Sequence, residues 1–594
     1  MTTELETPSA DTHRNWIENA DVRKLQIGCW IGFIAIALVR AWFTRYELMG
    51  GDSISYLDIA RAFAAGHLGA VTNPYWSPGY PALISLFFWA FHPNAYWEFP
   101  LVHLVHVLIF IGTLASFQLF WSETLQWHRK FARVRGAAIP ESAFWALGYA
   151  AFGIAILSVI KVSLVGADLL LSAFCCLAGW CTLCLRRDMS LSLCVLLGAV
   201  LALAYYAKAP FFPIGIVFII CACSWRPVSR RTILLAGTAF ITFLLGCAPL
   251  ITALSLAKGR LTFGDTARFN WAVFIDGVQY LHWQGGPPGS GTPVHPTHKL
   301  NDFPEIYEFA ADNMGTYPEW FDPTYWDEGI TPHLNLKRQM IVLVLNLALE
   351  FQFILESGAE LVCILIVLVL ICGHRNQWAE GLWQLWFIWV PGATAMAMFA
   401  LVHVEARFVG GWLLLLFAGA VCACSLPTDI GSRLTVSCAG AAALITVGAA
   451  LILQATTEAT GANHAAAGRS PRDVSLAVFL LGNGLHPGDP IAFIGDGSEA
   501  YWAHLARLHL IAEIPASIPR LPVHPAMDFW ESGPELQQEA LAILERTGAR
   551  AVIAGAMQHS VESSLRGGVP LVVPPPWKKI DGTGAYVYFF PARP

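Results

Sequence analysis

A series of long apolar segments constrains the fold of this chain more than any other feature. Several reach the 17–25 residues that an α-helix needs to cross a bilayer, and the segments lie at about 25–46, 99–121, 141–160, 167–185, 190–207, 210–224, 232–256, 352–372, 380–401, 408–425 and 434–453. Only 13% of the 594 residues are charged, whereas a soluble protein carries roughly 25%. We therefore expect a polytopic α-helical membrane protein with about eleven transmembrane helices.

Basic residues are concentrated in alternate connections between these segments. They are Arg23 and Lys24; Arg129, Lys130, Arg133 and Arg135; Arg186 and Arg187; Arg226, Arg230 and Arg231; His374 and Arg375; and Arg433. Because Lys and Arg in short loops favour the cytoplasmic side, the pattern predicts a cytoplasmic tail at 1–24 and a transmembrane body at 25–455. The loops at 47–98 and 257–350 and a C-terminal domain at 470–594 are then extracytoplasmic.

The C-terminal region has the composition of a soluble domain. We expect amphipathic helices at 498–508 and 535–548, alternating with strands at 491–495, 509–514, 550–556 and 585–590. This alternation predicts a small α/β domain. The GDGS turn at 495–498 lacks the GxGxxG spacing of a nucleotide site, and no basic stripe indicates nucleic acid. Most of the 14 cysteines lie within apolar segments, where they are expected to pack rather than to bind metal.

The first outer loop joins an amphipathic segment to a cluster of Pro, Gly and aromatic residues, GDSISYLDIARAFAAGHLGAVTNPYWSPGYP at 51–81. Residues 53–65 have helical periodicity and fit a helix lying in the membrane interface. The apolar stretch 78–91 is too short to span, so we expect it to be re-entrant or interfacial. Asp52 stands immediately before the helix, where it either caps the N-terminus or serves as a catalytic carboxylate, and the two roles are compatible.

Ionisable residues also collect in the other predicted outer turns, although basic residues are disfavoured in short outer loops. Asp168 begins one segment, Lys208 lies in YYAKAPFFP, and His403, Glu405 and Arg407 lie in HVEARF. A lipid phosphate would supply the anionic partner for Lys208 and Arg407. The alternative roles are structural: Asp168 caps a helix, Lys208 snorkels to the headgroups, and Arg407 pairs with Glu405 or Asp168.

Five motifs in this order resemble the GT-C superfamily of polyprenyl-phosphate-sugar-dependent glycosyltransferases: DSISYLDIARAFAAG, NPYWSPGYPALISL, VSLVGADLLL, AKAP and HVEARF. Familiar members are the protein O-mannosyltransferases and the bacterial aminoarabinose transferases. The resemblance implies a multi-pass protein of a bacterial-type inner (plasma) membrane that uses a polyprenyl-phosphate sugar as donor.

The sequence departs from this family at two places. The common acidic pair of the first loop is Asp52-Ser53 here, so one carboxylate is present. A divalent metal therefore stays an open alternative, and no cofactor is expected with confidence. The lysine-bearing proline-rich segment of the aminoarabinose transferases corresponds to TNPYWSPGYP, which has no lysine. The identity of the sugar is therefore not carried over.

The resemblance and the outer charges predict glycosyl transfer to an acceptor hydroxyl at the outer face, the acceptor being a glycan, a lipid or a protein. Asp52 is the candidate general base, and Asp168 would orient the acceptor or Asp52. Lys208 and Arg407 are the candidates for binding the donor phosphate. Further candidate substrate-binding residues are Tyr56, His403, Glu405 and His282.

Two other classes of protein stay open as alternatives. A secondary transporter or lipid flippase would carry ionisable residues or broken helices near mid-bilayer, but the centres of the apolar segments are nearly free of charge. A non-catalytic protein that displays the C-terminal domain would leave the long 257–350 loop and the outer charges without a purpose.

Overall fold

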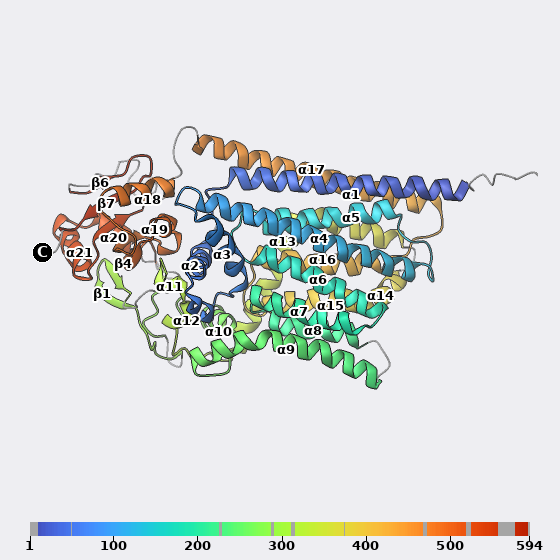
Figure 1. Cartoon of the computed structure of the whole chain (residues 1–594), viewed down its shortest axis with the longest axis horizontal. Coiled ribbons are helices and arrows are strands. Elements are labelled where there is room, and N and C mark those ends of the chain that lie inside the picture. The colour runs from blue at the N-terminus through green and yellow to red at the C-terminus, as the bar shows by residue number, and fades with distance from the viewer. Residues whose placement is uncertain are drawn as a thin grey trace, which may run out of the picture.

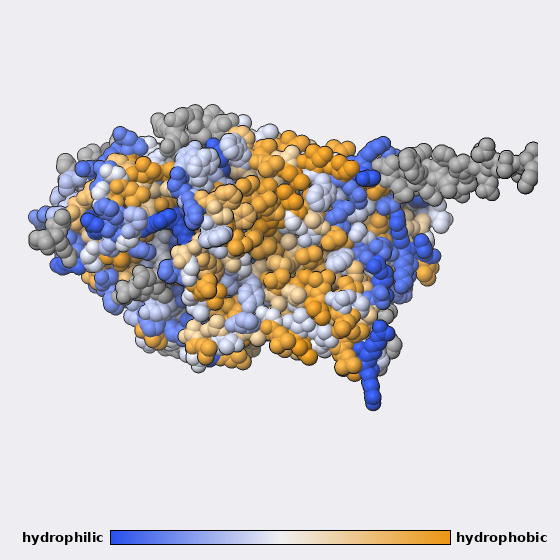
Figure 2. All heavy atoms as spheres, viewed as in Figure 1, coloured by the Kyte–Doolittle hydropathy of each residue, from blue (hydrophilic) through white to orange (hydrophobic). Residues whose placement is uncertain are grey.

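The computed structural model describes residues 10–48, 50–224, 229–286, 290–309, 315–372, 375–466, 472–517, 524–555 and 576–591. Most of its length is a bundle of helices, and a sheet lies at one end of the bundle (Figure 1). On the face in view, apolar residues cover the middle of the bundle and hydrophilic residues gather towards its two ends (Figure 2). Such a surface suits a bundle whose middle faces lipid.

Helices occupy all of the predicted apolar segments. Among the described residues, seven helices are long and apolar enough to cross a membrane; they belong to α1 (Ala10–Phe43), α4 (Glu98–Ala132), α5 (Glu141–Phe152) with the π-helix η2 (Gly153–Ile160), α6 (Asp168–Arg187), α9 (Arg230–Lys258), α13 (Leu336–Ile371) and α17 (Ile430–Ala466). Shorter apolar helices are α7 (Leu191–Ala207), α8 (Phe211–Cys223) and α16 (Ala406–Cys422). The chain is a multi-pass α-helical membrane protein, as predicted, while the count of eleven spans stays a prediction.

One further candidate span is broken. The helices α14 (Arg375–Gln384) and α15 (Trp386–Ala400) meet at an angle of 80°. Elsewhere glycines allow neighbouring helices to approach closely. A Cβ at Gly148 in α5 would lie 2.3 Å from the Trp121 indole of α4, and one at Gly198 in α7 would lie 2.6 Å from the carbonyl oxygen of Ala239 in α9. Small residues at such contacts are typical of helix pairs in membranes.

The connections predicted to be cytoplasmic lie together at one end of the bundle. The turn after α4 pairs with the turn after α16 through a β-bridge between Ala137 and Leu426. Ion pairs join neighbouring helices at this end, including Arg187 with Glu123 at 2.6 Å. Arg226 and His374, which belong to the same predicted set, lie outside the described residues. Which side of the membrane this end faces stays a prediction.

The first outer loop folds at the opposite end, as α2 (Asp52–Ala64), the short 3-10 helix η1 (Leu68–Thr72) and α3 (Gly79–Phe91). The α2 helix does not lie exposed on the membrane surface as expected. Residues on all of its faces are buried, among them Ser55, Tyr56 and Leu57. The Ser55 hydroxyl donates to the carbonyl of Trp320 at 2.9 Å, because the second outer loop covers the face that the amphipathic pattern had assigned to solvent.

The second outer loop contains α10 (Thr266–Trp271), the π-helix η3 (Ala272–Asp276), β1 (His298–Asp302), β2 (Glu305–Glu308), α11 (Pro318–Phe321) and α12 (Pro323–Trp326). Its two strands were not predicted. They pair with each other and extend the sheet of the C-terminal region, where Tyr307 of β2 lies opposite Glu513 in antiparallel register. The hairpin is short and has proline and glycine on both sides, so it lacks the long alternation of apolar and polar residues by which strands are recognised in a sequence.

The C-terminal region has the predicted α/β character. Its helices are α18 (Arg472–Gly482), the 3-10 turn η4 (Gly497–Glu499), α19 (Tyr501–Ala506), α20 (Pro525–Glu531) and α21 (Pro534–Arg546). Its strands are β3 (Pro490–Gly495), β4 (His509–Pro515), β5 (Ala551–Ala554), β6 (Lys578–Lys579) and β7 (Tyr586–Phe589). The seven-stranded sheet has the order β1-β2-β4-β3-β5-β7-β6, and β3 runs parallel to both β4 and β5. This region and both outer loops therefore form one layered cap over the end of the bundle (Figure 1).

Candidate active site

Five of the predicted site residues meet in one cluster beneath this cap. Arg407, in the first turn of α16, is at the centre: its Nη2 lies 2.6 Å from Oδ2 of Asp52, and its Nε lies 2.6 Å from Oε2 of Glu405. The same Nε lies 3.9 Å from Oδ2 of Asp168. Lys208, at the end of α7, donates to the other oxygen of Asp168. Three carboxylates and two cations from four separate connections are thus in contact.

The two aspartates begin helices without capping them. The N-cap of α2 is Gly51 and that of α6 is Ala167, and neither makes a side-chain capping bond. Asp52 and Asp168 are instead the first helical residues, where the helix dipole favours negative charge. The Asp52 carboxylate accepts from Nε1 of Trp320 at 3.3 Å in addition to Arg407. Its contacts are therefore directed at the cluster rather than at its own backbone.

Arg407 also pairs with Glu405, which was the alternative role predicted for it. Its contact with Glu405 joins two residues of one turn, and Glu405 is in turn 3.2 Å from Nε2 of His403. Burial by itself would raise the pKa of Glu405, but His403 and Arg407 outweigh it and lower the pKa to about 2. Glu405 is therefore ionised at any physiological pH. The His403 ring stacks on Phe274 with centroids 3.9 Å apart, which fixes its position beside the cluster.

Tyr56 lies next to the cluster but within an aromatic group. Its ring meets Trp76 and Tyr80 edge to face, with centroids 5.0 and 5.1 Å away. Burial, then the charges of Asp52 and Asp168, raise the pKa of Tyr56 above its ordinary value. The phenol is consequently neutral, and the structure gives it a packing role beside the carboxylates.

His282 belongs to a different group of side chains, at the junction of the second outer loop with the sheet. Its Nδ1 lies 2.5 Å from Oε2 of Glu319 and its Nε2 lies 2.7 Å from Oε1 of Glu513, and all three side chains are buried. Burial would lower the pKa of His282, but the two carboxylates outweigh it and raise the pKa to about 10. His282 is therefore an imidazolium that ties the outer loop to β4.

Within the described part of the chain, these three residues form the group that could hold a metal ion, since their ligand atoms lie within 4.8 Å of one another. The separations argue for direct ion pairs instead. Two ligands on one tetrahedral zinc at about 2 Å would lie roughly 3.3 Å apart, whereas these atoms are 2.5 and 2.7 Å apart. The two carboxylates also approach different nitrogens of the ring, and one metal ion binds only one of them.

Two contacts that the sequence did not suggest place the C-terminal region against the cluster. The amide of Gly50 donates to the hydroxyl of Tyr501 at 3.2 Å. A Cβ at Gly51 would lie 3.1 Å from the Cβ of Ser498 in the GDGS turn. The Gly-Gly pair could have been recognised as a turn, but nothing local indicates a partner about 450 residues away.

The cluster opens into a cavity of about 460 Å³, lined by Asp52, Lys161, Glu405 and Arg407 among others. A second, apolar groove of about 650 Å³ lies between α13, α15, α16 and η2. The two share Val159, Phe353 and Ser357 in their linings, so they adjoin each other. A polar chamber with cations thus lies next to an apolar groove among the membrane helices.

The fold and the site define the class: a multi-pass membrane protein with a buried carboxylate–cation cluster under a mixed α/β cap. Comparison with protein-family models finds no match, and no curated protein matches the sequence.

Several solved structures are similar in fold over most of the chain. ArnT from Cupriavidus metallidurans in the apo state is 12% identical, with a TM-score of 0.48 and coverage of 94% of this chain and 97% of that chain. The same protein bound to undecaprenyl phosphate is 11% identical, with a TM-score of 0.47 and coverage of 93% and 96%. The apo oligosaccharyltransferase of Archaeoglobus fulgidus is 11% identical, with a TM-score of 0.47 and coverage of 91% and 70%. The reaction is inferred from the site itself.

Proposed function

We propose that this protein transfers a sugar from a polyprenyl-phosphate donor to an acceptor hydroxyl at the outer face of the membrane. The observation that carries the proposal is that the Asp52–Arg407 cavity adjoins the apolar groove along α13 and shares lining residues with it. An amphiphile with a phosphate at the head and a long hydrocarbon tail matches this combination, since the tail would lie in the groove and the phosphate beside Arg407 and Lys208.

The chemistry follows from the charges of the cluster. An acceptor oxygen attacks the anomeric carbon and loses its proton to Asp52, while the bond from that carbon to the phosphate oxygen breaks. The electron pair leaves with the polyprenyl phosphate, whose growing negative charge is stabilised by Arg407 and Lys208. Asp168 holds Lys208 in place, and Glu405 holds Arg407 by its Nε.

Donor binding and base activation are coupled in this scheme. In the structure, Nη2 of Arg407 donates to Oδ2 of Asp52, so this oxygen is occupied and cannot at the same time accept from the acceptor hydroxyl. A donor phosphate would compete for Nη2 and release Oδ2 of Asp52 to the acceptor hydroxyl. The pair is only 17% and 20% exposed at its two side chains, so this exchange takes place largely out of water.

The test uses the full chain in liposomes with a panel of polyprenyl-phosphate sugars and an acceptor mixture of membrane glycans, lipids and proteins. We expect one donor to be consumed with release of polyprenyl phosphate. Arg407→Gln and Lys208→Met should raise the KM for that donor by at least tenfold, because each removes a cation from the phosphate. Lys24→Met, an exposed cation at the predicted cytoplasmic side, is the matched control. Consumption of no donor by the wild type would overturn the proposal, and movement of an intact lipid across the membrane would favour the flippase.

A further inference from the structure

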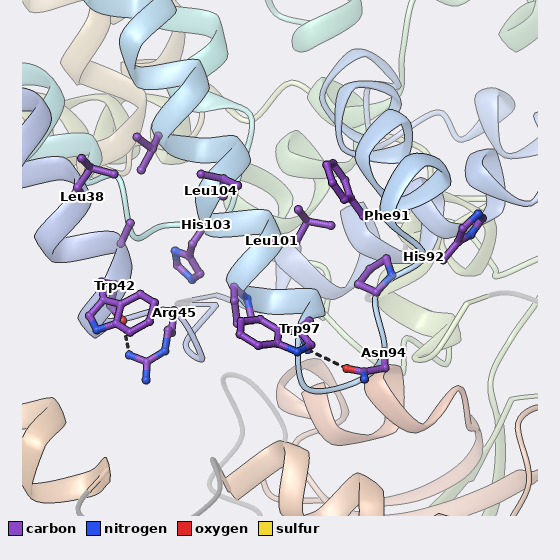
Figure 3. A pocket seen from close by; sticks show the side chains of 14 residues that line it. Leu38, Trp42, Arg45, Phe91, His92, Asn94, Trp97, Leu101, His103 and Leu104 are labelled. Atoms are coloured by element: carbon purple, nitrogen blue, oxygen red, sulfur yellow. Dashed lines mark hydrogen bonds between the residues drawn. The ribbon is translucent and has the colours of Figure 1, made fainter.

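Another groove lies on the outside of the bundle, and it shares no lining residue with the Asp52 cavity. It has a volume of about 620 Å³ and lies between the end of α1, the connection from α3 to α4, and the start of α4. Its walls are mainly apolar, and Figure 3 shows Trp42 and Arg45 on one side, Trp97 and Asn94 on the other, and His103 between them. Trp42 and Trp97 are more than half exposed, as aromatic residues at the level of lipid headgroups commonly are.

Arg45 is a cation that lines this groove and has no anionic partner among the described residues. Its guanidinium lies over the rings of Trp42 and Tyr46, at 4.2 and 4.7 Å from their centroids, and its Nη1 donates to the carbonyl of Trp42 at 2.5 Å. Within the part of the chain that the structure describes, no carboxylate lies within 4.0 Å of it. An arginine in this position differs from Arg407, which three carboxylates surround.

His103 provides an independent observation. The side chain is 1% exposed and lines the groove, yet its Nδ1 has no hydrogen-bond partner among the residues that the structure describes. Its Nε2 lies 2.7 Å from the carbonyl oxygen of Glu47. Because a carbonyl only accepts, Nε2 carries the hydrogen, and Nδ1 of the neutral ring is left as a buried acceptor. Leaving such a group unpaired is costly, and a hydroxyl in the groove would satisfy it.

We propose that this groove binds one anionic phospholipid whose headgroup carries a hydroxyl. The phosphate pairs with the Arg45 guanidinium, a headgroup hydroxyl donates to Nδ1 of His103, and an acyl chain lies along Leu38, Leu101 and Leu104. Each polar feature then has a partner of opposite kind, and the apolar wall between α1 and α4 is covered. This proposal does not depend on the glycosyl transfer proposed for the Asp52 cavity.

The test counts lipids retained by the full chain in native mass spectrometry after transfer from nanodiscs. Phosphatidylglycerol supplies the charge and the hydroxyl, phosphatidylcholine has neither net charge nor headgroup hydroxyl, and soluble glycerol phosphate has no chains. We expect one retained phosphatidylglycerol, at least fivefold less phosphatidylcholine, and no displacement by millimolar glycerol phosphate. Displacement by glycerol phosphate would show that the site binds a free phosphate, and it would overturn the proposal that the ligand is a phospholipid.

Variants separate the groove from general lipid contact. Arg45→Gln should lower retention of phosphatidylglycerol at least fivefold, and Leu104→Trp should do the same by filling the groove. The matched controls are Lys24→Gln, an exposed cation on the same α1 helix, and Leu119→Trp, an exposed leucine of α4 outside the groove. Wild-type retention in both Arg45→Gln and Leu104→Trp, or an equal loss in the controls, would overturn the proposal.

Discussion

Replacing Asp52 by asparagine separates the chemical role of this residue from its structural one. The two side chains have the same shape, so the amide oxygen can still accept from Nη2 of Arg407, a contact of 2.6 Å. The amide nitrogen cannot accept from Nε1 of Trp320, but that contact is long, at 3.3 Å. We therefore expect a stability loss of only about 1 kcal/mol.

The expected loss of rate is much larger. General-base catalysis contributes about 10²- to 10⁴-fold, which corresponds to roughly 3–5 kcal/mol of activation free energy at 1.36 kcal/mol per factor of ten. The loss should fall on kcat, because the cations that hold the donor phosphate are unchanged. The KM for the donor should stay within a few-fold of the wild-type value.

The assay measures polyprenyl phosphate released by the purified chain in liposomes, and a melting curve is recorded for each variant. Asp302→Asn, which changes an aspartate of the second outer loop whose side chain is 96% exposed, serves as the control and should match the wild type. If Asp52→Asn keeps more than a tenth of the wild-type kcat, Asp52 is not the base and the mechanism proposed above is wrong.

Two further predictions concern the cap. Gly51→Val should reduce transfer at least tenfold with the donor still bound, because its side chain would collide with Ser498 and displace the C-terminal region from the cluster; normal activity would show that this contact is dispensable. The pairing of His282 with Glu319 and Glu513 should make stability fall as pH rises, since the folded pKa of about 10 lies above the 6.5 of a free histidine. The stabilisation is complete below pH 6.5 and is lost as the pH rises through 10. His282→Gln should lower the free energy of unfolding by about 3 kcal/mol at neutral pH. The melting temperature of this variant should therefore change less between pH 6.5 and 10 than that of the wild type.

The sequence by itself determined the class of the protein and predicted which of its connections share one end of the bundle. Apolar length and the placement of Lys and Arg are properties of single segments, and each bilayer-spanning helix satisfies its own backbone hydrogen bonds. The helices therefore appear where the apolar segments are. For the same reason Asp52, Asp168, Lys208 and Arg407 could be assigned to one end of the bundle without knowing which of them touch.

Tertiary packing decided what those residues contact. Asp52 and Arg407 are 355 positions apart, and no periodicity in the sequence specifies that their turns adjoin. The same holds for His282, whose second carboxylate partner, Glu513, comes from β4. Arg45 is the reverse case, since a basic residue near the end of a helix has an ordinary appearance in sequence. Only the fold leaves it at the edge of a groove where no carboxylate of the described residues pairs with it, because pairing depends on which helices pack together and hydropathy does not record that.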